Sequence, residues 1–128
     1  MNLTKLLDHL DTFNEPILVD TLFEILSNFK PEKQEIKKYA RFDTNQYKRN
    51  DLRSSRFYEA LLLCWKPLQA SEIHDHKNSA CGVYVIEGTM TEIPFYVSEI
   101  DPPVPQEMKT LKEGSICVSF DDDTHEIL

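Results

Sequence analysis

Two of the four histidines in this chain stand one residue apart, in the segment His74-Asp75-His76. If the segment is a strand, its period of two puts both imidazoles on one face and Asp75 on the other. Imidazoles about 6–7 Å apart at their backbones can converge on one metal ion at about 2.0–2.2 Å. A single histidine, His125, follows much later in the chain. Together, these three side chains predict a metal site, although surface or core histidines would give the same pattern.

Arg49 and Cys81 are the other two residues whose types suggest chemistry. A guanidinium forms two parallel hydrogen bonds with a carboxylate and keeps its charge, so Arg49 is a candidate anchor for an acidic substrate. The alternative is a solvated arginine beside Lys48 and Arg53. Cys81 could equally be a small apolar core residue, because free cysteines are often buried.

An HxH pair, a glycine turn at Gly88 and a distant single histidine resemble the layout of the cupin β-barrel. Common cupins place a glutamate four or five residues after the second histidine, where this chain has Ala80 and Cys81. Three neutral imidazoles leave a ferrous ion with its full charge and open positions. Such a site suits an incoming thiolate together with dioxygen.

This combination resembles the thiol dioxygenases, and the cysteine dioxygenase family in particular. The resemblance is strong from about Ile36 to Gly88 and beyond Val97 depends mainly on Gly114 and His125. The segments that carry it are KYARFDTNQYKRN (Lys38–Asn50), LLLCW (Leu61–Trp65) and EIHDHKNSACGVYVIEGTMTE (Glu72–Glu92).

The resemblance implies a role for each matching position. The implied metal ligands, for Fe(2+), are His74, His76 and His125. Arg49 matches the arginine that holds the substrate carboxylate, and Tyr47 matches a tyrosine that supports that arginine at the edge of the substrate pocket. Cys81 matches the cysteine that forms a thioether with a tyrosine in animal members of the family. The implied pocket-wall residues are Trp65 and Cys64.

The resemblance also implies an activity, which is oxidation of the thiol of free L-cysteine to cysteine sulfinic acid by O2 without an organic cofactor. Alternatives are oxidation of another small thiol such as 3-mercaptopropionate, a cupin that uses zinc, nickel or manganese, and a truncated non-catalytic cupin. Relatives continue for several tens of residues beyond the third histidine and carry the crosslinked tyrosine there. Because this sequence ends at Leu128, we expect a fragment or a short form whose barrel is incomplete at the C-terminus.

The surrounding sequence predicts helices first and strands afterwards, in one cupin domain over residues 1–128. Residues 1–40 are expected to be helical and to pack on the barrel strands of residues 41–128. With Asn2 as an N-cap, apolar spacing and prolines predict helices over Leu3–Phe13 and Leu18–Phe29. A short amphipathic turn is expected around Gln34–Ala40. Predicted strands are Ala60–Trp65, Cys81–Glu87, Thr89–Val97 with an interruption at Pro94, and Ser115–Phe120, with a loop at Ser98–Gln106. The expected fold class is mainly β, a cupin-type barrel preceded by N-terminal helices.

Composition limits the possible partners. The 128 residues carry a formal net charge of −8, which argues against binding to nucleic acid or an anionic membrane. The longest apolar runs are too short to cross a bilayer. Three cysteines without a recognisable secretion signal indicate reduced thiols in the cytoplasm. We therefore expect a cytoplasmic monomer whose partners are the small molecules L-cysteine and O2.

Overall fold

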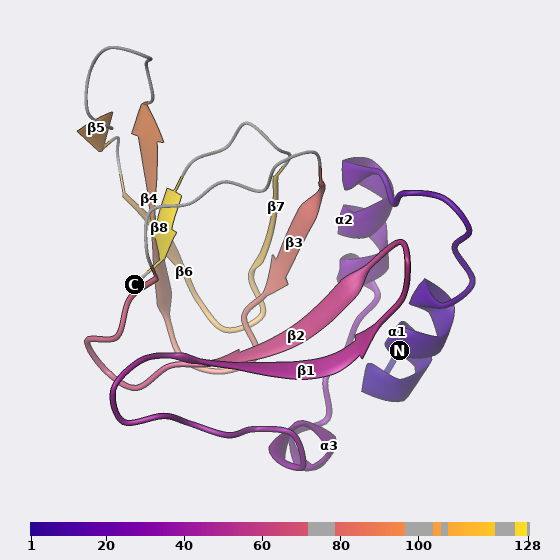
Figure 1. Ribbon diagram of the computed structural model, residues 1–128, viewed down its shortest axis with the longest axis horizontal. Helices are drawn as coiled ribbons and strands as arrows, with labels where there is room; N and C mark the ends of the chain where they lie inside the picture. The colour runs from indigo at the N-terminus through magenta and orange to yellow at the C-terminus, as the bar shows by residue number, and fades with distance from the viewer. Residues whose placement is uncertain (72–78, 97–103, 106–107, 120–124, 128) are drawn as a thin grey trace.

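The computed structural model describes residues 1–71, 79–96, 104–105, 108–119 and 125–127. Helices come first and strands follow, as the sequence predicts (Figure 1). The helices are α1 (Leu3–Leu10), α2 (Val19–Ser27) and α3 (Lys33–Lys37). The strands are β1 (Lys48–Ser54), β2 (Glu59–Cys64), β3 (Cys81–Tyr84), β4 (Met90–Tyr96), β5 (Val104–Pro105), β6 (Lys109–Leu111), β7 (Ile116–Ser119) and β8 (His125–Ile127).

Helix α1 begins at the cap that the sequence predicts. The side chain of Asn2 accepts a hydrogen bond from the backbone N–H of Lys5 at 2.9 Å. The leucines at helical spacing are buried, whereas the helix ends at Leu10 and not at Phe13. Glu35 of α3 ties the third helix to this end, because its carboxylate accepts hydrogen bonds from the Leu3 N–H and the Thr4 hydroxyl. The Met1 amino group donates to the Asn28 carbonyl and the Lys30 N–H donates to the Met1 carbonyl, which ties the end of α2 to the same place. The three helices are therefore connected.

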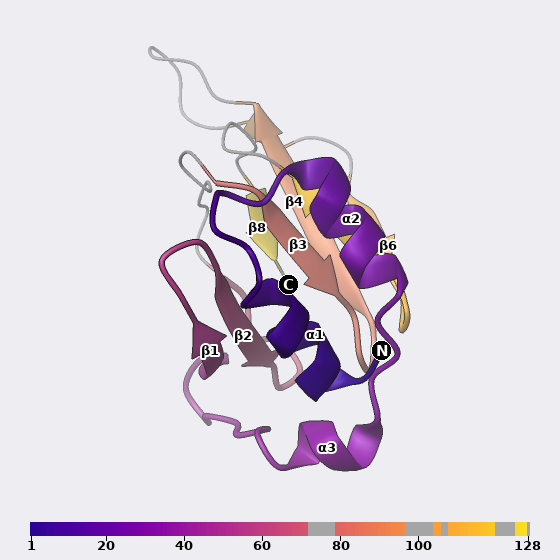
Figure 2. The same cartoon turned by 90° about the vertical axis from the view of Figure 1, so that its right-hand side faces the viewer.

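The strands pair in small antiparallel sheets. Strands β1 and β2 form a hairpin, β3 pairs with β7, and β4 pairs with β5, β6 and β8. Helix α2 lies against β3 and β7, and Figure 2 shows it running alongside β3. Among the described residues these sheets do not close into a barrel, so the cupin-type barrel and the single cupin domain stay predictions.

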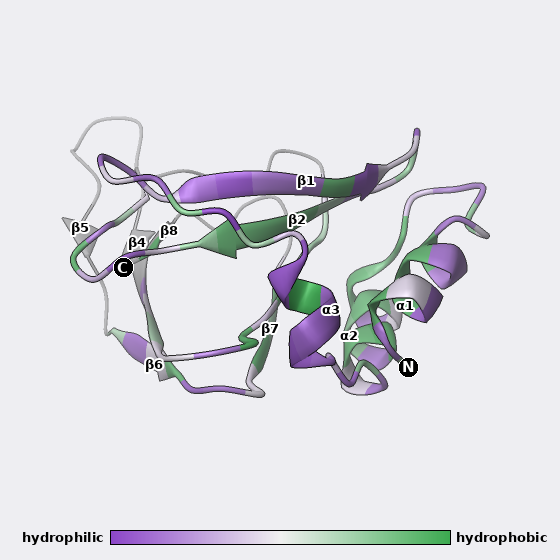
Figure 3. Ribbon diagram, turned by 90° about the horizontal axis from the view of Figure 1, so that it is seen from below, coloured by the Kyte–Doolittle hydropathy of each residue, from purple (hydrophilic) through white to green (hydrophobic). Residues whose placement is uncertain are grey.

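The β1–β2 hairpin has one face that supports the core. Leu62 and Cys64 of β2 are buried in a cluster with the leucines of α1 and with Ile25, Phe29 and Ile36. Figure 3 shows that β2 is largely hydrophobic and β1 largely hydrophilic. Because neighbouring residues on a strand point to opposite faces, the residues between these core positions face away from the helices.

Two parts of the strand prediction differ from the structure. The predicted loop Ser98–Gln106 contains β5, a two-residue strand that pairs with β4. The interruption predicted at Pro94 leaves β4 unbroken from Met90 to Tyr96 and lies instead in the pairing of β4 with β6 and β5. Its pairs with β6 end at Glu92 and its pairs with β5 begin at Phe95, so Pro94 lies between them on that side. A proline N–H is not needed there.

The helices of the described chain are short. None of them reaches the length and apolar character that would let it pass through a bilayer.

Candidate functional site

The aromatic pair Tyr47 and Trp65 marks the candidate site on the hairpin. The first pair of the hairpin joins Lys48 to Cys64, and Tyr47 and Trp65 are the next residues outward on each side. Their rings are stacked, with centroids 4.2 Å apart and planes 9° from parallel. Both residues were predicted to border the substrate pocket, and the structure brings them together. The stacked rings form a flat aromatic wall at one end of the hairpin.

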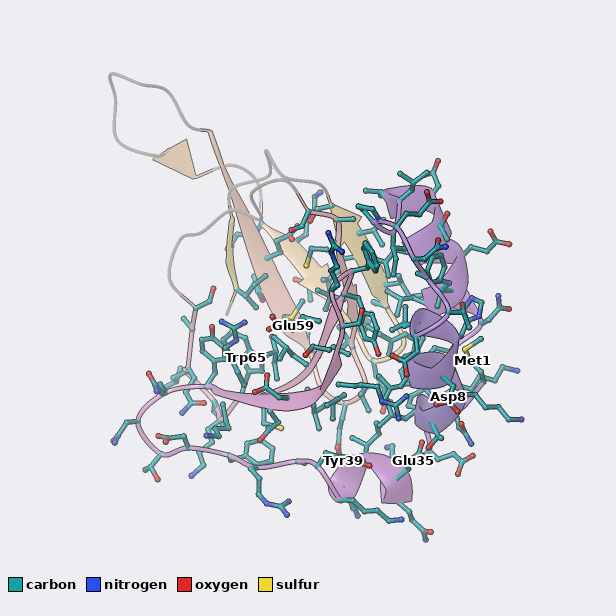
Figure 4. The ribbon with its side chains drawn as sticks, turned by 45° about the vertical axis from the view of Figure 1, so that its right-hand side comes forward. Met1, Asp8, Glu35, Tyr39, Glu59 and Trp65 are labelled. Carbon is teal, nitrogen blue, oxygen red and sulfur yellow. The ribbon has the colours of Figure 1, made fainter. Side chains whose placement is uncertain are left out.

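Arg49 lies on the same face of the hairpin as this wall. It is two residues after Tyr47 and pairs with Leu63, which is itself two residues before Trp65. Its guanidinium Nη2 lies 3.5 Å from Glu59 Oε1, and both side chains are 59% exposed. Figure 4 shows Glu59 and Trp65 on the same side of the hairpin. The exposed guanidinium of Arg49 therefore lies on the face of the hairpin that carries the aromatic wall, and it points along the strand toward Glu59.

Cys64 lies on the opposite face from Trp65, which corrects the prediction that both residues line a pocket. Its thiol is buried in the core cluster below the helices. The side-chain amide of Asn50 donates hydrogen bonds to the Leu62 carbonyl at 3.2 Å and to Cys64 Sγ at 3.5 Å. Burial raises the pKa of the Cys64 thiol, and the Arg41 and Asn50 hydrogen bonds oppose that rise. Cys64 is therefore a core residue, because strand alternation separates it from its neighbour.

Cys81 begins β3 and is half-buried. Burial raises the pKa of its thiol to about 11, and the neighbouring Cys117 and Glu92 add to that effect. In the β3–β7 register Cys81 faces Ser119 and Val83 faces Cys117, so the two cysteines are diagonal neighbours on one face. Cys117 Sγ donates to Glu92 Oε2 at 3.9 Å. The sequence interpretation missed Cys117 and Glu92, because only strand pairing brings them next to Cys81.

A buried pair of hydrogen bonds ties Ser71 to Ile127 of β8. The Ser71 N–H donates to the Ile127 carbonyl at 2.7 Å, and the Ile127 N–H donates to Ser71 Oγ at 2.9 Å. Ser71 precedes the His74-Asp75-His76 segment by three residues, and His125 is the first residue of β8. The chain just before the two clustered histidines is thus fixed beside the strand that carries the third.

The structure describes little of the three predicted metal ligands. His74 and His76 lie outside the described residues, and for His125 the structure gives its place in β8, opposite Pro94 of β4. Within the part of the chain that is described, no three histidine, cysteine or acidic side chains are gathered as a metal site would require. The ligand set therefore stays a prediction.

Comparison with known proteins identifies the family of the chain. The family model for cysteine dioxygenase type I matches residues 3–127, almost the whole chain. The chain belongs to the cysteine dioxygenase type I family. Cysteine dioxygenase type 1 of Homo sapiens is 31% identical over 83 residues, and that of Danio rerio is 30% identical over 84 residues. The family that the sequence motifs indicate is thereby confirmed.

These matches cover only part of each cysteine dioxygenase relative. The human alignment takes in 63% of this chain and 41% of the human protein, and the zebrafish alignment takes in 64% and 41%. The chain therefore spans well under two thirds of the length of the curated relatives that it matches.

Proposed function

We propose that this chain carries the substrate anchor and the metal ligands of an iron-dependent thiol dioxygenase, which oxidises free L-cysteine to cysteine sulfinic acid with O2. The observation that carries the proposal is the placement of Arg49. In a member of the cysteine dioxygenase family, this exposed cation lies on the same face of the hairpin as the stacked Tyr47 and Trp65 rings. A guanidinium that shares a face with a flat aromatic wall is suited to a small carboxylate.

The residues that would hold Fe(2+) are His74, His76 and His125. The Ser71–Ile127 hydrogen bonds support this set. His74 is three residues from Ser71, a reach of at most about 11 Å, and His125 is two residues from Ile127. This reach would let His74 and His125 approach one ion, and three imidazoles suit a divalent iron. When bound, iron would supply the activation of dioxygen for transfer to sulfur.

The side chains on the hairpin would position the substrate. Arg49 would hold the carboxylate of L-cysteine through two parallel hydrogen bonds, which fixes the direction in which the thiol points. Tyr47 and Trp65 would limit the width of the pocket beside it. Cys81 stands where common cupins place an acidic ligand, so the negative charge at the metal would come from the thiolate of the substrate.

Oxygen uptake by the iron-loaded chain tests the proposal. We expect consumption of O2 with L-cysteine and the appearance of cysteine sulfinic acid by mass spectrometry. Arg49→Ala should raise KM for L-cysteine by roughly tenfold or more, because a charge-assisted hydrogen bond contributes about 1.5–3 kcal/mol. Iron content should stay unchanged in Arg49→Ala and be lost in His74→Ala.

The remaining alternatives are outcomes of the same experiment. Faster turnover of 3-mercaptopropionate than of L-cysteine would reassign the substrate. Activity with zinc, nickel or manganese but not with iron would reassign the metal. Full metal binding without O2 uptake for any small thiol would indicate a non-catalytic cupin and refute the proposal.

A further inference from the structure

Arg49, the proposed substrate anchor, has a carboxylate of the chain itself as its neighbour. Arg49 Nη2 lies 3.5 Å from Glu59 Oε1. Glu59 is the first residue of β2 and pairs with Ser54, whereas Arg49 pairs with Leu63. Four residues along a strand cover about 13 Å. The two long side chains therefore meet only because they extend toward each other along the hairpin, and Arg49 leans away from the aromatic wall at Trp65.

The contact is of a kind that a ligand can displace. At 3.5 Å it is a single ion pair at the outer limit of hydrogen-bond length, and both partners are 59% exposed. Exposed ion pairs of this type are weak because solvent screens them. A free carboxylate that approaches the guanidinium in its plane could form two short hydrogen bonds instead of one long contact.

Glu59 would also make the site sensitive to whether the ligand carries an ammonium group beside its carboxylate. Once displaced, its carboxylate can still extend along the same face of the hairpin toward the guanidinium, as it does in the ion pair. At neutral pH L-cysteine carries an ammonium group beside its carboxylate, and 3-mercaptopropionate carries the carboxylate alone. The negative charge of Glu59 would attract the ammonium of the first compound and only repel the carboxylate of the second.

We propose that Glu59 is a specificity-determining residue, which competes for Arg49 and so selects amino-acid thiols over thiols that carry only a carboxylate. The proposal rests on the proposed function, since it assumes that Arg49 anchors the substrate. It gives a physical reason for a preference between the two candidate substrates that the sequence leaves open.

The test measures both compounds against the Glu59→Gln variant. Glu59→Gln keeps the size of the side chain and removes its charge. The iron-loaded chain is assayed for KM with L-cysteine, and 3-mercaptopropionate is measured as a competitive inhibitor of L-cysteine oxidation. We expect Glu59→Gln to tighten inhibition by 3-mercaptopropionate roughly two- to fivefold, the effect of removing one exposed ion pair. KM for L-cysteine should change less than the inhibition constant.

The chain offers a matched control for the loss of one negative charge. Glu113 pairs with Lys33 at 3.4 Å. The lysine side chain is 62% exposed and the glutamate side chain is 55% exposed. Glu113→Gln therefore removes the same charge from a similar ion pair that contains no part of the hairpin. We expect it to leave the ratio of the two constants unchanged. If Glu113→Gln changed this ratio as much as Glu59→Gln does, the effect would come from the net charge of the protein and the proposal would be overturned.

Arg49→Ala separates failure of this proposal from failure of the proposed function. One outcome is that Arg49→Ala weakens the binding of both compounds while Glu59→Gln leaves the ratio of KM for L-cysteine to the inhibition constant of 3-mercaptopropionate unchanged. In that case the anchoring role of Arg49 stands and the role of Glu59 is refuted. If Arg49→Ala changes neither constant, the anchoring role itself fails. In the double variant the Glu59→Gln effect should disappear, because the competition needs both charges.

Discussion

Gly82→Ala is expected to destabilise the fold, because Leu22 and Leu26 of α2 approach Gly82 of β3 closely. A Cβ at Gly82 would lie 2.7 Å from Leu26 Cδ1, 2.8 Å from Leu22 Cδ2 and 2.9 Å from Leu22 Cγ. Carbon atoms in ordinary contact are about 3.5–4.0 Å apart, so α2 or its leucines would have to retreat by roughly 0.6 Å or more. The glycine thus permits the close approach of helix and strand.

The size of the effect follows from two opposing contributions. Overpacking of a fitted core costs about 1–3 kcal/mol, whereas alanine in place of a strand glycine recovers about 0.5–1 kcal/mol of conformational entropy. The net loss in the free energy of unfolding therefore lies between about 0 and 2.5 kcal/mol, with a central value of about 1 kcal/mol. For a domain of this size a loss of about 1 kcal/mol lowers Tm by roughly 3–6 °C.

Urea unfolding followed by circular dichroism measures this loss. Leu22→Ala removes two of the three close atoms and is the matched partner in a double-mutant cycle. We expect Gly82→Ala to cost much less in the Leu22→Ala background than in the natural chain. Equal costs in both backgrounds, or a Gly82→Ala variant as stable as the natural chain, would refute the steric reasoning.

Two further predictions concern alkaline pH. Burial and the hydrogen bond that Tyr58 donates to Asp11 raise the pKa of Tyr58 to about 12. Its contribution to stability is therefore present below pH 10 and lost as the pH rises toward 12. In Tyr58→Phe the unfolding free energy should therefore fall less steeply between about pH 10 and pH 12. The same slope in the variant and the natural chain would contradict the role of Tyr58. Because burial raises the pKa of Cys81 to about 11, its alkylation by iodoacetamide should stay slow at pH 8 and increase toward pH 11. Peptide mass mapping would follow that rate, and a midpoint near pH 8.5 would be the contrary result.

Local patterns in the sequence predicted the helical layer well. The Asn2 cap and the leucine spacing of α1 act within a few residues of each other, so they need no knowledge of the tertiary fold. The end of α1 was missed by three residues, because helix ends fray and leucine spacing does not locate them. The strands Ala60–Trp65 and Cys81–Glu87 were found, although β3 ends at Tyr84.

Strand pairing was beyond the reach of these patterns. Strand β6 has no alternation long enough to predict, and β5 has only two residues; both exist because β4 offers them a partner. The same cause explains why Cys117 and Glu92 were missed beside Cys81. Their proximity depends on which strands lie next to each other, and that is a property of the whole chain.

The sequence by itself determined the family, the candidate ligands His74, His76 and His125, and the candidate anchor Arg49, because these are matters of residue type and spacing. Only the tertiary structure decided that Tyr47 stacks on Trp65, that Cys64 belongs to the core, and that Arg49 meets Glu59. Each of these follows from the register of one hairpin and from the face that the helices cover. Register and coverage arise from contacts between distant segments, and no local pattern contains them.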